Sequence, residues 1–196
     1  MRTKGMLALV AFLLPASAAL ASPFQWPMVE GGNGHHYEMI PASGMTWQEA
    51  RVVAESMEHL GVQGHLATLT TEAELVFVLS LSERPTFGAY LGAWQKLAGD
   101  LDPGESYGWR WMTGEAWDSV LPQWCPWIDC NTGTYLSVTR MAYEGVVYYW
   151  EGLVGDEAME HFVVEFDGMP VVDPPEGAVG NESSSWGSVK QRYRSP

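Results

Sequence analysis

Acidic side chains are the most abundant charged groups in this 196-residue sequence. They number 24, against 10 Lys and Arg residues, and give a formal net charge of −14 at pH 7. Carboxylate oxygens are ligands that a hard cation such as calcium prefers, so some of them could form a calcium site. The alternative is a solvated acidic surface. In either case the charge argues against DNA or RNA as a partner, because phosphate binding relies on clustered Lys and Arg.

Groups that could perform catalysis are few. The sequence has no Ser-His-Asp arrangement and no nucleophile elbow in a supporting context. The carboxylates of Glu115 and Asp118 could serve glycoside hydrolysis, but chance pairs are expected in so acidic a chain. His35 and His36 are adjacent, and neighbouring strand residues point to opposite faces, so we expect surface histidines there. We predict that the protein is not an enzyme.

The first 21 residues are typical of a secretory signal peptide. Arg2 and Lys4 form a positive start, residues 6–14 are apolar, and residues 19–21 have the small-residue pattern of a cleavage site. A membrane anchor is the alternative, but the apolar run is shorter than the roughly 20 residues that span a bilayer. We therefore expect a secreted or extracellular protein with no membrane span; a periplasmic location fits the same signal.

Export favours a disulfide between the two cysteines. Cys125 and Cys130 are the only pair, and an oxidising compartment would join them. Closing so small a loop supplies at most about 2 kcal/mol, so the bond would hold one local shape. Trp127 lies inside this ring, and a rigid, exposed aromatic side chain suits carbohydrate or protein recognition. Core packing is the alternative, and it is what we expect for Trp111 and Trp150.

The elements that must position these residues are short strands and two helices. Thr46 fits an N-cap with Glu49 three residues later, and a second helix starts at Thr70 or Thr71. Strands are expected at 36–40, 89–94, 109–112, 135–139, 146–150 and 161–166. This order indicates the α+β class, with two helices packed on short antiparallel sheets and a long loop over 115–134. The expected organisation is a signal peptide (1–21), an N-terminal lead (22–33), one domain (34–169) and a flexible tail (170–196).

Several of these segments resemble the C-type lectin-like domain. Residues 46–51 and 64–74 are similar to its two-helix region, and residues 90–93 to its Trp-Ile-Gly-Leu strand. Residues 109–114 match its Trp-x-Trp-x-x-Gly strand, and residues 162–166 its closing strand. The resemblance implies that family's fold, in which the N- and C-terminal strands pair and a long loop region forms the binding face.

The resemblance does not extend to the family's main sugar site. Many sugar-binding members bind calcium through Glu-Pro-Asn or Gln-Pro-Asp in the long loop, whereas residues 123–127 read Gln-Trp-Cys-Pro-Trp. The family's Trp-Asn-Asp appears here as Trp-Glu-Gly, which keeps only Glu151 as a ligand. The four framework cysteines are also missing. Sugar binding through that calcium therefore does not carry over.

A second calcium position of the family does match this sequence. It uses a backbone carbonyl before the second helix, a Glu on that helix and a Glu on the closing strand, which correspond to Thr68, Glu74 and Glu165. Such an ion would be structural, because it would join the helix to the terminal strands. The alternative is that both carboxylates lie on solvated faces.

Together these features predict an exported ligand-binding module whose partner is a glycan or an extracellular protein. A structural or adhesive surface protein that binds other proteins through the same loops is the alternative. The sequence does not indicate an oligomeric state. The expected ligand-binding residues lie in the long loop and in the segments around 151–157: Trp124, Trp127, Asp129, Asn131, Glu151, Asp156 and Glu157.

Overall fold

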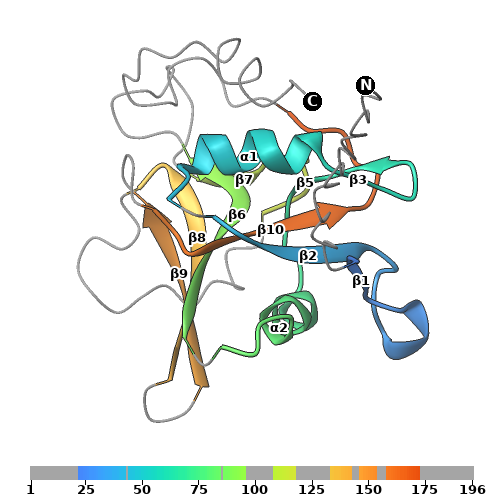
Figure 1. Cartoon of the computed structure of the whole chain (residues 1–196), viewed down its shortest axis with the longest axis horizontal. Coiled ribbons are helices and arrows are strands. Elements are labelled where there is room, and N and C mark those ends of the chain that lie inside the picture. Colours follow the sequence, from blue (N-terminus) through green and yellow to red (C-terminus); the bar gives the residue numbers. More distant parts are fainter. Residues whose placement is uncertain are drawn as a thin grey trace, which may run out of the picture.

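The computed structural model describes residues 22–42, 44–84, 86–95, 108–117, 133–142, 146–153 and 158–172. Within these ranges two α-helices combine with a largely antiparallel sheet (Figure 1), which confirms the α+β class. The elements in chain order are β1 (Phe24–Gln25), the 3-10 helix η1 (Met28–Glu30), β2 (His36–Pro41), α1 (Trp47–Ser56), β3 (Glu58–His59), β4 (Val62–Gln63), β5 (His65–Leu66), α2 (Glu72–Ser80), β6 (Phe87–Gln95), β7 (Trp109–Trp111), β8 (Tyr135–Ala142), β9 (Val146–Leu153) and β10 (His161–Phe166).

The main sheet is built around β10, the last described strand. Its order is β1-β2-β10-β6-β8-β9, with β5 also paired to β10 and β7 to β6. Strand β10 pairs antiparallel with β2, as the resemblance implied for the terminal strands. The pairing is antiparallel as expected except between β10 and β6, which run parallel over two residue pairs. Strands β3 and β4 form a separate small ladder that the sequence pattern did not predict.

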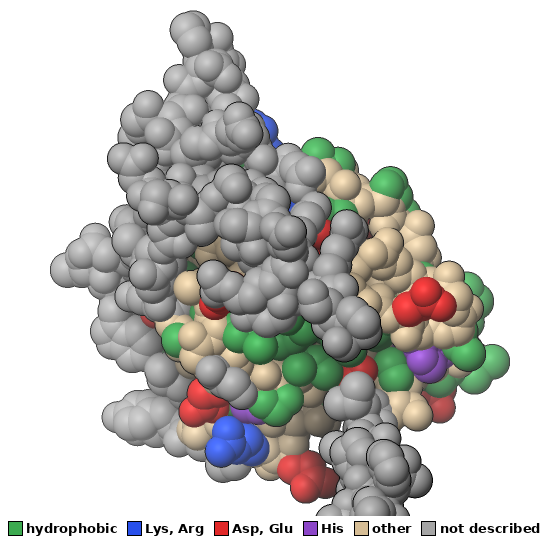
Figure 2. All heavy atoms as spheres, turned by 45° about the horizontal axis from the view of Figure 1, so that its top comes forward, with side chains coloured by type: hydrophobic (Ala, Val, Ile, Leu, Met, Phe, Trp, Pro, Cys, Tyr) green, Lys and Arg blue, Asp and Glu red, His purple; other side chains and the backbone are tan. Residues whose placement is uncertain are grey.

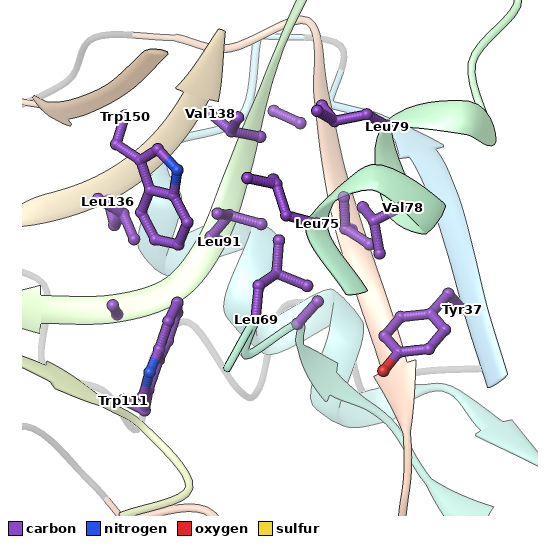
Figure 3. Packing of buried hydrophobic residues seen from close by; sticks show 14 of the residues in the cluster. Tyr37, Leu69, Leu75, Val78, Leu79, Leu91, Trp111, Leu136, Val138 and Trp150 are labelled. Carbon is purple, nitrogen blue, oxygen red and sulfur yellow. The ribbon is translucent and has the colours of Figure 1, made fainter. Parts of the chain in front are cut away.

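The two helices lie on opposite sides of the β2–β10 pair, and each covers its own core cluster (Figure 1). Side chains alternate along β10: Phe162 and Val164 belong to the cluster that contains Trp47 of α1. Val163 belongs to the cluster under α2, which Figure 3 shows with Leu75 among its members. Trp111 and Trp150 are buried in that second cluster, as expected.

Both helices begin where the sequence places an N-cap. The Thr46 side chain accepts a hydrogen bond from the Glu49 N–H, and the Glu49 carboxylate accepts one from the Thr46 N–H, which completes a capping box. The Thr71 hydroxyl accepts a hydrogen bond from the Glu74 N–H at 3.1 Å. Since this cap fixes the first turn of α2, it also fixes the position of Glu74.

The segment between β5 and α2 is anchored by a close approach to Gly92 of β6. A Cβ at Gly92 would lie 2.2 Å from the Leu66 carbonyl oxygen, so only glycine fits there. The Gly92 N–H donates to the Ala67 carbonyl at 2.8 Å, and the Ala67 N–H donates to the Val163 carbonyl at 2.9 Å. These bonds hold the chain between β6 and β10 and thereby place Thr68 beside Glu165.

Acidic side chains are spread over the face seen in Figure 2, where basic side chains are few among the described residues. In the described part of the chain, no helix combines the length and apolar character that crossing a membrane would require.

Candidate functional site

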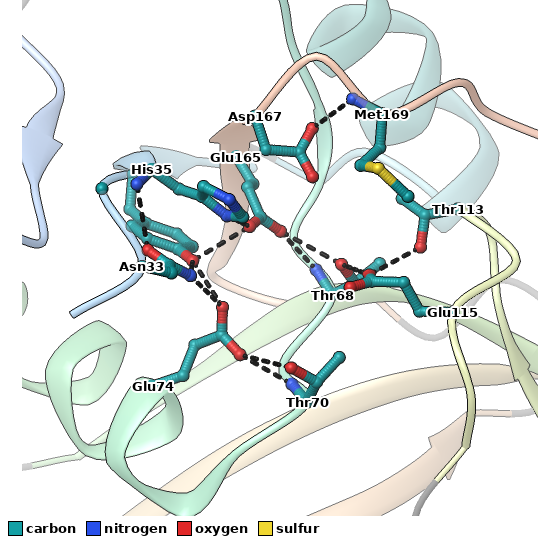
Figure 4. A network of polar contacts seen from close by, with 12 residues as sticks. Asn33, His35, Thr68, Thr70, Glu74, Thr113, Glu115, Glu165, Asp167 and Met169 are labelled. Atoms are coloured by element: carbon teal, nitrogen blue, oxygen red, sulfur yellow. Dashed lines mark hydrogen bonds and ion pairs between the residues drawn. The ribbon is translucent and has the colours of Figure 1, made fainter. Parts of the chain in front are cut away.

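A buried polar network lies where β2, β5 and β10 meet the start of α2 (Figure 4). Glu165 of β10 pairs with Tyr37 of β2 on one side and His65 of β5 on the other. By alternation, Glu165 lies on the same face of β10 as Val163, which is the face that α2 covers. It therefore meets Glu74 of α2, and the two residues are only 1% and 2% exposed.

All four carboxylate oxygens of Glu74 and Glu165 have polar partners. One Glu74 oxygen is 2.9 Å from the Asn33 amide nitrogen, and the other accepts from the Thr70 N–H at 2.7 Å. One Glu165 oxygen is 2.7 Å from Nδ1 of His35, and the other accepts from the Thr68 N–H at 2.9 Å. These contacts satisfy two buried carboxyl groups that would otherwise strongly destabilise the fold.

The Tyr37 hydroxyl joins the two carboxyl groups. It lies 2.5 Å from Glu74 and 2.9 Å from Glu165, and both contacts are buried. A phenol has one proton and can donate to only one of them, so the other carboxyl group must supply a proton. Burial and the nearby charge of Glu165 outweigh the hydrogen bonds and raise the pKa of Glu74. We assign the extra proton to Glu74, which donates to Tyr37, which in turn donates to Glu165.

Two histidines contact acidic side chains of this region, His35 at Glu165 and His65 at Asp167. The hydrogen bond to Glu165 outweighs burial and raises the pKa of His35. His65 is buried, with Nδ1 2.9 Å from the Leu66 carbonyl and Nε2 2.9 Å from Asp167 Oδ1. Both of its nitrogens face oxygen acceptors, which requires the imidazolium form. Burial opposes that charge, but Asp167 and Glu165 raise the pKa of His65, and His65 in turn keeps the pKa of Asp167 low.

The residues predicted for a calcium ion come together, but the space between the two carboxyl groups is taken by Tyr37. The Thr68 N–H binds Glu165, and Glu165 reaches Glu74 through the Tyr37 hydroxyl. A calcium ion between Glu74 and Glu165 would have to displace that hydroxyl, so this arrangement fits a shared proton better than a cation with six to eight oxygen ligands. The alternative of two solvated carboxylates is wrong, because both are buried. The calcium ion itself stays a prediction.

A separate pocket of about 240 Å³ opens beside β7. Its walls are largely indole rings, from Trp94, Trp109, Trp111 and Trp117, and its lining includes Arg110 and Glu115. The Arg110 guanidinium lies over the Trp94 ring at 5.6 Å from the centroid. Trp117 packs on Trp111 with the ring centroids 4.9 Å apart. The pocket thus combines flat apolar surfaces with one charge of each sign.

Glu115 links this pocket to the buried network. Its carboxylate oxygen Oε2 accepts hydrogen bonds from the hydroxyls of Thr113 at 2.8 Å and Thr68 at 2.7 Å. The Thr68 hydroxyl also lies 3.2 Å from Glu165. Thr68 therefore contacts a carboxylate of the pocket and a carboxylate of the network at once.

Among the predicted ligand-binding residues, Glu151 is described. It lies half-buried on β9, and its carboxylate is 3.3 Å from the Thr139 hydroxyl on β8. The other predicted ligand-binding residues lie outside the described residues: Trp124, Trp127, Asp129, Asn131, Asp156 and Glu157. Asp118 and the two cysteines of the expected disulfide, Cys125 and Cys130, also lie outside them.

The sequence analysis missed the role of several network residues. It assigned His35 to the surface, whereas its side chain is 31% exposed and contacts Glu165. His35 and His36 do point apart as expected, since His36 packs against His59 with centroids 4.7 Å apart. Tyr37 and Asp167 were not singled out at all. The alternation of His35 with Tyr37, and of Val163 with Glu165 and Asp167, was the available signal.

Comparisons with known proteins give one curated relative and several solved structures. No family model matches the sequence. Halomucin of Haloquadratum walsbyi is 40% identical over 82 residues, which are 41% of this chain and 1% of that protein. The C-type lectin domain of murine dendritic cell inhibitory receptor 2, solved in complex with N-glycan, has 16% identity and a TM-score of 0.45 over 67% of this chain and 89% of that one. Human lithostathine has 20% identity and a TM-score of 0.44 over 69% and 93%. The solved structures that resemble this chain thus include a C-type lectin domain, the family whose motifs its sequence resembles.

Proposed function

We propose that this chain is an exported, non-enzymatic binding module that takes a carbohydrate in the tryptophan-lined pocket beside β7. The pocket is the observation that carries the proposal. Sugar rings present an apolar C–H face that packs on indoles, while their hydroxyls need polar partners at the rim. Here the half-buried Trp117 offers an indole surface, and Arg110 and Glu115 offer a donor and an acceptor.

The size of the pocket limits the ligand. Its volume of about 240 Å³ is below the roughly 300–1,000 Å³ typical of pockets for drug-sized ligands. One sugar ring, at the end or side of a glycan, fits this volume better than a long buried oligosaccharide. The long loop that starts at Glu115 would extend the contact surface, with Trp127 as its expected aromatic residue.

The proposed binding does not depend on calcium, because the sequence lacks the Glu-Pro-Asn and Trp-Asn-Asp ligands of the sugar-binding relatives. Binding to a glycan array should therefore persist in the presence of a chelator. A calcium requirement for glycan binding would contradict this part of the proposal.

Glycan arrays probed with two variants and one control test the function. Arg110→Ala removes an exposed charge at the pocket, and Trp127→Ala removes the loop aromatic; each should weaken binding about tenfold or more, as loss of a central contact does. Arg84→Ala is the matched control, because Arg84 is an exposed arginine that pairs with Glu160 away from the pocket. Absence of any glycan signal, together with recovery of a protein partner that Arg110→Ala releases, would favour the adhesive alternative.

A further inference from the structure

We propose that His35, Glu165 and Asp167 form a binding site for a divalent transition-metal ion of the zinc class. The three residues each offer one ligand atom, and these atoms all lie within 4.8 Å of one another. The site shares Glu165 with the predicted calcium position but uses neither Thr68 nor Glu74. None of its three ligands lines the proposed glycan pocket.

The backbone fixes the three side chains next to each other. Phe166 of β10 pairs with His36 of β2, and Glu165 pairs with Tyr37, so the next pair in this antiparallel register is Asp167 with His35. Glu165 and Asp167 are two residues apart along β10 and its continuation, which places both on the same face. Glu165 lies on β10, and His35 and Asp167 are directly beside the ends of the paired strands, so the three ligands need little ordering when an ion binds.

An unpaired buried oxygen of Asp167 is a second, independent observation that points to a bound cation. Its side chain is only 1% exposed, and its oxygen Oδ1 contacts His65 and accepts from the Met169 N–H at 2.7 Å. The second oxygen, Oδ2, is buried and has no hydrogen-bond partner. A buried carboxylate oxygen without a partner is costly, and binding of a cation by Asp167 would satisfy it. Figure 4 shows the Asp167 side chain near those of Glu165 and His35.

The chemistry of the ligands selects the ion. One imidazole nitrogen with two carboxylates suits zinc and related ions, whereas calcium takes oxygen ligands only. Around zinc, bonds of about 2.0–2.2 Å put neighbouring tetrahedral ligands roughly 3.4 Å apart, so modest side-chain rotations would close the present spacing. The ion would take the place of the proton between His35 Nδ1 and Glu165, which lie 2.7 Å apart.

The surroundings support such a site. Zinc-bound carboxylates are usually held by further hydrogen bonds; here Asp167 contacts His65, and Glu165 contacts Tyr37 and Thr68. The His35 side chain is 31% exposed, which gives an ion a route from solvent. Three protein ligands leave a fourth position for water or an outside ligand.

Calorimetric titration and thermal melting of the chelator-treated, tag-free mature chain test the proposal, with zinc chloride and calcium chloride as separate probes. Zinc should bind one site in the wild type and raise its melting temperature. His35→Ala and Asp167→Asn should each weaken zinc binding by about a hundredfold, the upper range for disturbing a zinc site. His36→Ala and Glu160→Gln are the matched controls and should leave zinc affinity within about threefold, since His36 packs against His59 and the exposed Glu160 pairs with Arg84, away from the three ligands.

Three outcomes would overturn the inference. One is that the folded wild-type chain binds no zinc at about 100 µM, a concentration roughly a hundred times a dissociation constant of about 1 µM. Another is equal zinc binding by wild type and His35→Ala; because His35 is half-exposed, this variant should fold, and its melting curve without zinc checks that it does. The third is zinc binding that Glu74→Gln abolishes and His35→Ala leaves intact, which would place the zinc ion at the family's position and not between His35, Glu165 and Asp167.

Discussion

The Tyr37 hydroxyl joins two buried carboxyl groups, and its removal should destabilise the domain measurably. Tyr37→Phe keeps the ring, which is fully buried and packs edge-on against Phe77 with the centroids 5.7 Å apart. What disappears is the hydroxyl with its contacts to Glu74 and Glu165 and the hydrogen bond that it accepts from the Asn33 amide at 2.7 Å. The variant therefore isolates the polar bridge from the packing.

The magnitude follows from which partners remain. Glu74 keeps Asn33 and Thr70, and Glu165 keeps His35 and Thr68, so no carboxyl group loses all its donors. The contacts of the hydroxyl with Glu74, Glu165 and Asn33 are all lost, but each partner keeps another hydrogen bond. We therefore expect a cost near that of one hydrogen bond to a charged group, about 2 kcal/mol, and not the sum of all contacts. For a domain of this size, that corresponds to a fall in melting temperature of roughly 4–8 °C.

Urea unfolding and thermal melting at pH 7 would measure this change. Tyr148→Phe is the control, because Tyr148 is half-buried and has no hydrogen bond from its hydroxyl among the described residues; its free energy of unfolding should change by less than about 0.5 kcal/mol. If Tyr37→Phe costs no more than this control, the hydroxyl does not bridge the carboxyl groups and the proton assignment to Glu74 is wrong.

Two further predictions concern pH and the expected disulfide. The folded-state pKa of His65 lies above its ordinary value of 6.5, so the stability from its bond to Asp167 should be fully present below pH 6.5 and lost as pH rises through the raised value. Melting temperature should therefore decline on the alkaline side, and His65→Gln should reduce that decline, leaving the part that comes from the raised pKa of His35; an unchanged profile in the variant would contradict the imidazolium assignment. Reduction of a Cys125–Cys130 bond should lower the melting temperature by only a few degrees, since so small a ring contributes about 2 kcal/mol at most, whereas global unfolding on reduction would refute a local role.

Features encoded over a few residues were predictable from the sequence. The N-caps at Thr46 and Thr71 depend on neighbours three positions away, and both are present. The short run rich in Phe and Val over residues 161–166 predicted β10 with its observed bounds. Strands β3, β4 and β5 were missed because two residues are too short for a period to show.

The polar network depends on contacts that a local pattern cannot reveal. His35 and Glu165 are 130 positions apart, and only the β2–β10 register joins them. Glu74 and Glu165 were singled out through the family resemblance, because alternation along a strand can give the face on which Glu165 lies but not the carboxyl group that it meets there. Tyr37 looks like an ordinary strand residue until two carboxyl groups are found beside its hydroxyl.

The central place of β10 affects when the domain can fold. This strand is made after every other described strand, yet it must insert between β2 and β6 and also pair with β5. Until residue 166 has been synthesised, β2 and β6 lack the partner that joins them, and open strand edges favour association with other chains. Contacts this distant in sequence form slowly. The emerging chain should therefore stay unfolded until late in synthesis, which is the state in which a polypeptide can still be threaded through an export channel.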